Sequence, residues 1–184
     1  MIKSKADYKE YLAADASALG INTKKVIAIF GGTRYYIYKY QRLLRKCEYY
    51  SNCKKGLFYK PYKMYLKFKF RSRSIKYGFE IPLNCFGKGL SIAHIGPIII
   101  NGYVKVGDNC RIHPGTCIGT AKGYGDMSPV LGNNVYIGPG AKLFGKITIA
   151  DNITIGANAV VTKSFEQENV SIAGVPAKII SEKN

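Results

Sequence analysis

The sequence lacks any hydrophobic run long enough to cross a bilayer. A spanning helix needs about 20 consecutive apolar residues, whereas the longest apolar run in the N-terminal half covers only residues 26–30. The first residues also lead into no apolar segment of the kind found in secretory signal peptides. We therefore expect a protein without a membrane-spanning segment or a signal peptide, located in the cytoplasm.

Paired cysteines are also missing. The chain has five cysteines, an odd number, and no two of them have the C-x-x-C spacing of a metal-binding pair. The sequence therefore predicts reduced thiols and no metal site. The five are Cys47, Cys53, Cys85, Cys110 and Cys117.

Acidic residues are scarce, and the imbalance is uneven along the chain. The sequence has 11 Asp and Glu against 28 Lys and Arg, a net charge of +17, of which +14 falls within residues 1–80. Twelve of the 15 tyrosines also lie there, while 15 of the 20 glycines follow residue 80. This break in composition predicts a basic, Tyr-rich, mainly helical region over residues 1–80 and a different region over residues 81–184.

The second region contains a six-residue repeat. A period of six fits neither a 3.6-residue helix nor a two-residue strand alternation. It fits a triangular coil in which each unit supplies one short strand and one corner, and three such units close one turn. Ordinary sandwich strands are the alternative, but they would not keep a fixed phase over ten positions. The repeating aliphatics are Ile100, Val106, Ile112, Ile118, Leu131, Ile137, Leu143, Ile149, Ile155 and Val161.

Three motifs in this repeat resemble the hexapeptide acyltransferase family: IGPGAK at residues 137–142, IGANAVV at 155–161 and AGVPAK at 173–178. The segment LSIAHIG at residues 90–96 is most similar to the serine acetyltransferase branch. The resemblance implies a left-handed parallel β-helix, an exception to the usual right-handed crossover, preceded by an α-helical region. It also implies acetyl-CoA as the acetyl donor and a homotrimer whose active sites lie between neighbouring subunits.

The chain has only two histidines, His94 and His113. Acetyl transfer to a hydroxyl needs a general base, and histidine suits that role near neutral pH. Counting back one unit from Ile100 places His94 in an aliphatic position, where a polar side chain inside a dry coil would be unfavourable. We therefore expect an irregular first coil that presents His94 at its rim.

The resemblance implies that His94 is the catalytic base, because it matches the catalytic histidine of the serine acetyltransferases. A structural histidine capping the coil is the alternative. Counting three units forward stacks His94 over Ile112, so His113 would share its neighbourhood. We predict both histidines in the site, and we favour a non-catalytic contact over catalysis for His113.

The repeat is interrupted by seven extra residues between Ile118 and Leu131. They predict a loop over about residues 120–128 that lines a binding site. In the serine acetyltransferases this loop carries a second functional histidine before a proline, where this chain has Ser128. An aspartate precedes their catalytic histidine, where this chain has Ala93. Ala93 offers no carboxylate to the ammonium of a free amino acid, and Ser128 cannot titrate near pH 7 as an imidazole does. Both departures therefore weaken serine as the acceptor.

The resemblance also implies contacts with CoA, position by position. Small residues would lie along the pantetheine arm, and two lysines would meet the phosphates. Corner geometry explains each glycine equally well. The implied residues are Gly119, Thr120, Pro139, Gly140 and Ala157 for the arm, and Lys163 and Lys178 for the phosphates.

Residues 6–17, 33–50 and 57–70 read as helices, although the alternation over residues 66–70 would also suit a strand. Three interpretations of this basic region are open. The region could be a helical cap on the β-helix and trimer, a peripheral contact with anionic lipid, or a nucleic-acid surface. No nucleic-acid motif is present, so we expect no nucleic-acid partner.

These features predict an acetyl-CoA-dependent O-acetyltransferase. We expect its acceptor to be a sugar hydroxyl in a surface polysaccharide such as capsule or lipopolysaccharide, because Ala93 and Ser128 depart from the serine enzymes. A serine O-acetyltransferase of cysteine biosynthesis is the alternative. A trimeric scaffold without activity is a third possibility, and the presence of His94 argues against it.

Overall fold

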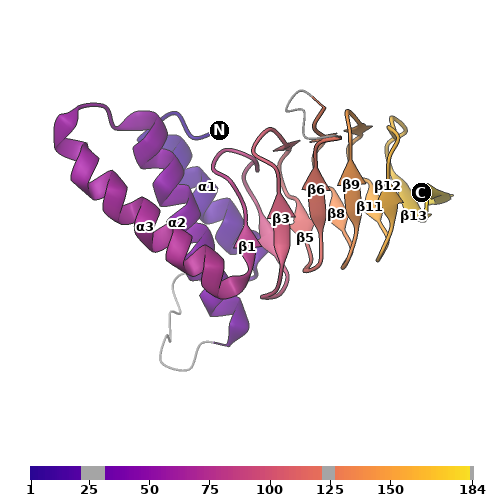
Figure 1. The fold of residues 1–184 in the computed structure, drawn as a ribbon, viewed down its shortest axis with the longest axis horizontal. Coiled ribbons are helices and arrows are strands. Elements are labelled where there is room, and N and C mark those ends of the chain that lie inside the picture. The colour runs from indigo at the N-terminus through magenta and orange to yellow at the C-terminus, as the bar shows by residue number, and fades with distance from the viewer. Residues whose placement is uncertain (22–31, 122–126, 183–184) are drawn as a thin grey trace.

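The computed structural model describes residues 1–21, 32–121 and 127–182 (Figure 1). Three helices, α1 (Lys5–Ala18), α2 (Thr33–Cys53) and α3 (Lys60–Tyr77), lie at one end of an elongated stack of short strands. A 3-10 turn, η1 (Leu57–Tyr59), precedes α3. The apolar run at residues 26–30 and the centre of the expected loop, residues 122–126, lie outside the described residues. Within the described ranges, no helix is long and apolar enough to cross a membrane.

The helices start and stop where local chemistry predicts. The Ser4 hydroxyl accepts a hydrogen bond from the Asp7 amide at 3.0 Å and so caps α1. Pro61 lies in the first turn of α3, and Gly78 ends that helix with a φ of +72°. All three expected helices are confirmed. Residues 66–70 are helical because Leu66 packs against Leu43 and Cys47 of α2, so the strand alternative was wrong.

The strands form three sheets, ordered β1-β3-β6-β9-β12, β10-β7-β4 and β14-β13-β11-β8-β5-β2. Every pair is parallel except the hairpin of β13 and β14. The strands are β1 (Phe79–Glu80), β2 (Ser91–Ile92), β3 (Ile98–Ile100), β4 (Lys105–Val106), β5 (Arg111–Ile112), β6 (Cys117–Gly119), β7 (Val130–Leu131), β8 (Tyr136–Ile137), β9 (Lys142–Phe144), β10 (Thr148–Ile149), β11 (Thr154–Ile155), β12 (Val160–Val161), β13 (Val170–Gly174) and β14 (Ala177–Glu182).

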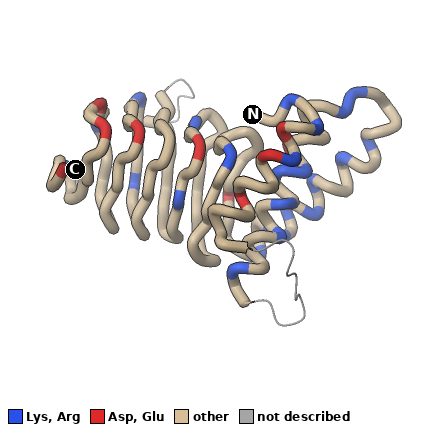
Figure 2. Tube along the Cα trace, turned by 180° about the vertical axis from the view of Figure 1, so that it is seen from behind, with Lys and Arg blue, Asp and Glu red and all other residues tan. Residues whose placement is uncertain are grey.

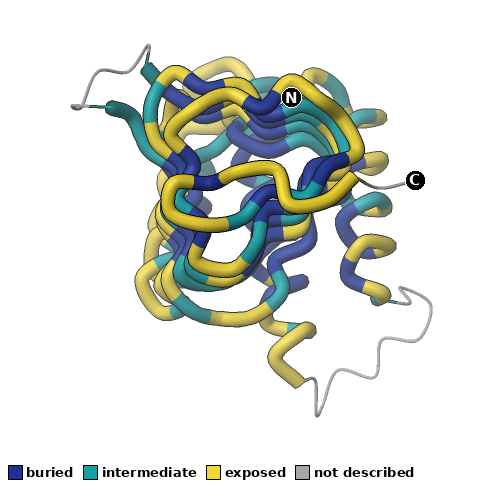
Figure 3. The backbone as a smooth tube through the Cα atoms, turned by 90° about the vertical axis from the view of Figure 1, so that its right-hand side faces the viewer, coloured by how far each residue is buried: buried dark blue, intermediate teal, exposed yellow. Residues whose placement is uncertain are grey.

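The register confirms the triangular coil. Ile100 pairs with Ile118 and Ile137 pairs with Ile155, so each aliphatic meets the one that lies three units further along the chain. Val106 pairs with Leu131 even though the interruption lies between them, so the seven extra residues leave the stack without shifting it. The repeating aliphatics are buried in one continuous core, and the coils superpose when seen along their axis (Figure 3). The fold is a left-handed parallel β-helix.

The corners depend on asparagine and glycine for different reasons. Six asparagines in the described part of the chain, among them Asn109, Asn134 and Asn152, have positive φ, which asparagine tolerates better than most residues. Asn109 Nδ2 donates to Asn134 Oδ1 at 3.1 Å, and Asn134 Nδ2 donates to Asn152 Oδ1 at 2.9 Å. At Gly107 the need is space, because a Cβ there would lie 2.7 Å from the carbonyl oxygen of Gly132 in the next coil.

The helices cap the open edge of the first coil. The side-chain amide of Gln41 donates to the Leu90 carbonyl at 2.6 Å and accepts from the Ile92 amide at 3.2 Å. Asp15 Oδ1 accepts from the Leu90 amide at 2.9 Å. These bonds satisfy backbone groups of Leu90 and of Ile92 in β2, which would otherwise form an unpaired strand edge. This arrangement supports the cap interpretation for α1 and α2.

A buried ion cluster fastens the cap. Arg45 is fully buried and lies 2.8 Å from Asp15 and 3.1 Å from Glu48. Its guanidinium also donates to the Phe86 and Gly87 carbonyls of the first coil. The helices and the coils share one apolar cluster as well, so the predicted division at residue 80 stays a prediction.

Candidate active site

His94 lies at an enlarged corner of the first coil. Ile92 pairs with Ile112, which makes this coil longer than the regular coils by two positions, and the extra length falls in residues 93–97 between β2 and β3. The expected stacking of His94 over Ile112 was therefore wrong, because Ile92 occupies that inward position. The expectation of an irregular first coil is confirmed, and the His94 side chain is exposed.

The three sheets form the sides of a triangular prism, and the corners of successive coils stack along its edges. We call the edge that carries this corner the histidine edge (residues 93–97, 113–116, 138–141 and 156–159). His113 lies on it one coil further along, and the two imidazole centroids are 6.2 Å apart. The structure therefore brings both predicted histidines together. They meet through the enlarged corner rather than through the regular count of three units.

The ring of His113 is held by two neighbours. Its Nδ1 lies 3.0 Å from the Ile137 carbonyl oxygen. A carbonyl only accepts, so Nδ1 carries the hydrogen and Nε2 of the neutral ring accepts. The Tyr136 hydroxyl lies 3.4 Å from that Nε2. These contacts fix the orientation of the His113 imidazole beside His94.

The surroundings of His113 favour its neutral form. Partial burial lowers the pKa of His113 below its ordinary value of about 6.5. The hydrogen bond to the Ile137 carbonyl opposes this shift, while the charges of Arg111 and of protonated His94 lower the pKa further.

We expect His113 to titrate below pH 6.5 in an NMR titration of the imidazole signals. Because the unfolded chain binds its proton at about pH 6.5, the folded state binds fewer protons just below that pH. The free energy of unfolding should therefore fall as pH decreases from 6.5 toward the folded pKa of His113. Above pH 6.5 the contribution of His113 to stability should be fully present. A titration midpoint above 6.5 would contradict this account. His94→Gln should raise the midpoint only slightly, because burial is the largest cause.

Sequence reasoning missed a polar column on the outer face of the six-stranded sheet beside the histidines. Arg111 Nη1 donates to Ser91 Oγ at 3.0 Å, and Arg111 pairs in register with both Ser91 and Tyr136. Each residue immediately precedes an inward isoleucine. Their position before an inward isoleucine was the signal that the sequence offered. It identifies neighbours in the sheet only once the lengths of the two irregular coils are known.

The residues implied for CoA fall on separate parts of the prism. Pro139, Gly140 and Ala157 continue the histidine edge. Gly119 ends β6 and Thr120 follows it, while Lys163 follows β12; all three lie at the next edge, between the five- and three-stranded sheets. Lys178 lies on the terminal hairpin. A single chain therefore does not bring all seven together.

Two of those glycines also have structural reasons. A Cβ at Gly119 would lie 3.0 Å from the Phe144 ring. Gly140 has a φ of +75°, and a Cβ there would collide with the Asn158 side chain. Corner geometry thus accounts for Gly140, as the sequence analysis allowed, whereas Gly119 is explained by the space that Phe144 occupies.

Comparison with known proteins adds to this geometry. The family profile described as bacterial transferase hexapeptide (six repeats) matches residues 128–163. Serine acetyltransferase of Synechococcus elongatus is 38% identical over 95 residues, 51% of this chain and 38% of that protein. Serine acetyltransferase of Helicobacter pylori (strain J99) is 39% identical over 106 residues, 56% of this chain and 61% of that protein. The comparisons thus agree with the resemblance to the hexapeptide acyltransferases and to their serine acetyltransferase branch.

A solved structure extends the likeness over the helical region. Serine acetyltransferase in complex with coenzyme A from Brucella abortus strain S19 has a TM-score of 0.73 at 25% identity, covering 98% of this chain and 70% of that chain. The chain spans between 38% and 61% of the length of the curated relatives named above. The sequence similarity to those two relatives covers about half of this chain.

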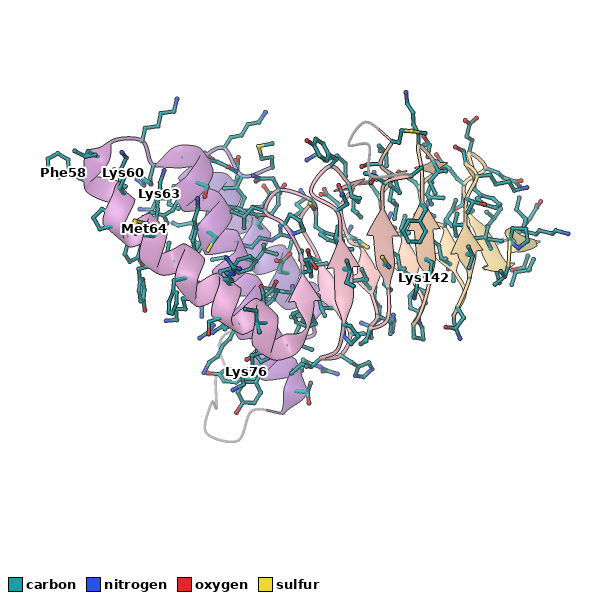
Figure 4. All side chains as sticks on the ribbon, viewed as in Figure 1. Phe58, Lys60, Lys63, Met64, Lys76 and Lys142 are labelled. Carbon is teal, nitrogen blue, oxygen red and sulfur yellow. The ribbon has the colours of Figure 1, made fainter. Side chains whose placement is uncertain are left out.

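Lys142 is a further feature of the histidine edge that the sequence did not reveal. Its ammonium donates to the Gly140 carbonyl at 2.8 Å and also to the Gly115 carbonyl, so it joins two successive corners (Figure 4). Ser128, which stands where the serine enzymes carry a histidine, is buried. Over the described residues, no group of three or more His, Cys, Asp or Glu is placed to hold a metal ion.

Proposed function

We propose that this chain transfers the acetyl group of acetyl-CoA to a hydroxyl group. The observation that supports the proposal most directly is an exposed imidazole, His94, at an enlarged corner with a second imidazole 6.2 Å away. The choice of donor is supported by a solved structure of similar fold, which is a serine acetyltransferase in complex with coenzyme A.

His94 acts as the base in this proposal. It removes the proton of the acceptor hydroxyl while the oxygen attacks the thioester carbonyl carbon. The tetrahedral intermediate then loses the thiolate of CoA, which takes up the proton from the His94 imidazolium. The products are an acetyl ester and free CoA thiol. His113 borders this step, and its lowered pKa keeps it uncharged near neutral pH.

The comparisons favour L-serine as the acceptor. The curated relatives and solved structures named above are serine acetyltransferases, and none of these names supports the sugar acceptor that the sequence analysis preferred. We therefore propose serine first. Arg111, exposed on the face beside the histidines, is a cation suited to the carboxylate of an amino acid.

A sugar hydroxyl remains the second candidate on one specific observation. Asp108 is the only carboxylate among residues 81–121, and its Oδ1 already accepts from the Lys88 amide at 3.0 Å. Ala93 and Ser128 offer no charge to the ammonium of serine. A sugar has no ammonium, so it loses nothing from these replacements.

Thiol release from acetyl-CoA separates the two acceptors. With L-serine as sole acceptor, we expect saturable turnover, and a panel of nucleotide sugars and oligosaccharides should give little. The matched variant Ala93→Asp should lower KM for L-serine by adding a carboxylate beside His94, without changing rates on sugars. Turnover on the sugars with none on L-serine would reverse the order of the candidates. Absence of thiol release with every acceptor would refute acetyl transfer.

We further propose a homotrimer with sites between subunits. The separation of the implied CoA residues onto two edges of one prism supports it, because the edge of one subunit can face the other edge of its neighbour. Residues on the histidine edge would then supply the reacting groups, and the second edge would supply Gly119, Thr120 and Lys163 from the adjacent copy.

A further inference from the structure

Helix α3 and the turn before it carry apolar side chains that the rest of the described chain does not cover. Phe58 is 98% exposed, Phe68 75%, Ile75 74% and Met64 71%. Leu57 and Pro61 are exposed as well. At 3.6 residues per turn, positions 61, 64, 68 and 75 fall on one side of the helix. We call these six residues the α3 face; Phe58 and Met64 project from the outer end of the helix in Figure 4.

Basic residues border this face on both sides. One row consists of Lys60, Lys67 and Arg71, because residues seven and four positions apart lie on the same side of a helix. Lys69 and Lys76 form a row on the opposite side. Helix α3 contains seven Lys and Arg and no Asp or Glu, and Figure 2 shows Lys and Arg spread along the helical region.

The positive charge continues past Lys69 into a groove of about 400 Å³ between the helices. Five basic residues and no acidic ones line this groove, together with tyrosines. The basic residues are Lys39, Arg42, Lys46, Lys69 and Arg73.

We propose that the α3 face is a docking surface for an anionic membrane. An exposed apolar stripe flanked by Lys and Arg suits the boundary between headgroups and acyl chains, where the apolar side chains insert and the cations meet lipid phosphates. A second copy of the chain is a poorer occupant, because the same face would bring five further positive charges against the five that border the first. The proposal goes beyond acetyl transfer and does not depend on it.

The docking surface continues toward the candidate site. Arg71 and Ile75 of α3 also line an apolar groove of about 600 Å³ between the end of the helix and the first coil. The other wall of that groove includes Pro97, which belongs to the enlarged corner that carries His94. A membrane held by α3 would therefore lie beside that corner.

Co-sedimentation of the full chain with vesicles tests the proposal. We expect binding to vesicles of phosphatidylcholine mixed with anionic phosphatidylglycerol, little binding to phosphatidylcholine alone, and weaker binding at high salt. Met64→Glu/Phe68→Glu should abolish binding. Lys60→Gln/Lys67→Gln/Arg71→Gln should weaken it on the order of 100-fold, taking roughly fivefold per basic residue near an anionic surface.

Matched variants elsewhere serve as controls. Ile179→Glu/Ile180→Glu places two acids on the exposed terminal strand, and Lys5→Gln/Lys9→Gln/Lys146→Gln removes three exposed charges outside α3. Both should bind vesicles as the wild type does, and circular dichroism verifies that every variant is folded. The readout needs no acetyl donor or acceptor, so its outcome is separate from that of the acetyl-transfer assay.

Three results would overturn the proposal. One is the absence of binding to anionic vesicles. Another is equal loss of binding in the α3 and control variants. The third combines two findings: the wild type binds no vesicles, and Met64→Glu/Phe68→Glu has a lower mass than the wild type by sedimentation velocity. The α3 face would then be a contact between copies of the chain, either within the proposed trimer or between two trimers.

Discussion

Replacing His94 with alanine is expected to lower the rate of acetyl transfer about 10²- to 10⁴-fold, the range for loss of a general base. The imidazole is exposed at the enlarged corner and has the reach to take a proton from a bound hydroxyl. His113 is less suited to this role, because its basic nitrogen, Nε2, faces the Tyr136 hydroxyl at 3.4 Å. CoA binding should be retained, since the residues implied for CoA lie on other corners.

The measurement is thiol release under saturating acetyl-CoA, together with calorimetric binding of CoA to the variant. His113→Ala is the matched control, an equal truncation one coil away, and we expect it to cost less. A near wild-type rate for His94→Ala would remove His94 from the mechanism. A larger loss for His113→Ala than for His94→Ala would exchange their roles.

Replacing Arg45 with methionine is expected to lower the free energy of unfolding by about 3–5 kcal/mol, the usual effect of removing one partner of a buried ion pair. The reason is that Asp15 and Glu48 are nearly as buried as Arg45 and would keep charges without a counter-ion. The Phe86 and Gly87 carbonyls would lose a donor at the same time. For a chain of this size the melting temperature should fall by roughly 10 °C.

Urea unfolding and thermal melts followed by circular dichroism measure this effect. Lys88→Met breaks the ion pair with Glu10, which is exposed, and should leave the melting temperature nearly unchanged. Arg45→Met/Asp15→Asn/Glu48→Gln removes the stranded charges and should recover part of the loss. An Arg45→Met variant as stable as the wild type would show that the cluster does not hold the cap on the first coil.

The coil architecture was predictable because each six-residue unit repeats the same local requirement. Each unit needs one inward aliphatic residue, one corner that tolerates positive φ, and often a glycine where the next coil comes close. Val106 and Gly107 show this pattern, and Leu131 and Gly132 repeat it. The helices were predictable for similar local reasons, such as the Ser4 cap. The interruption after Ile118 was visible as a break in phase.

The site was predictable only in part. His94 and His113 stood out as the two histidines inside the repeat, but their relative placement depends on an enlarged corner that a regular count of units does not reveal. Tyr136, Arg111 and Lys142 were missed because their importance comes from neighbours in the adjacent coil, a full turn of the β-helix away along the chain.

The sequence by itself determined the β-helix, its phase and the helices, because each follows from a pattern of residue types that can be read along the chain. The tertiary structure alone decided how the first coil meets the cap, where Gln41 and Arg45 satisfy backbone groups of residues more than 40 positions away. It also decided that the α3 face stays uncovered while Leu66 on the same helix is buried. The sequence contains equally apolar residues on both sides of α3, and only packing against α2 determines which side faces outward.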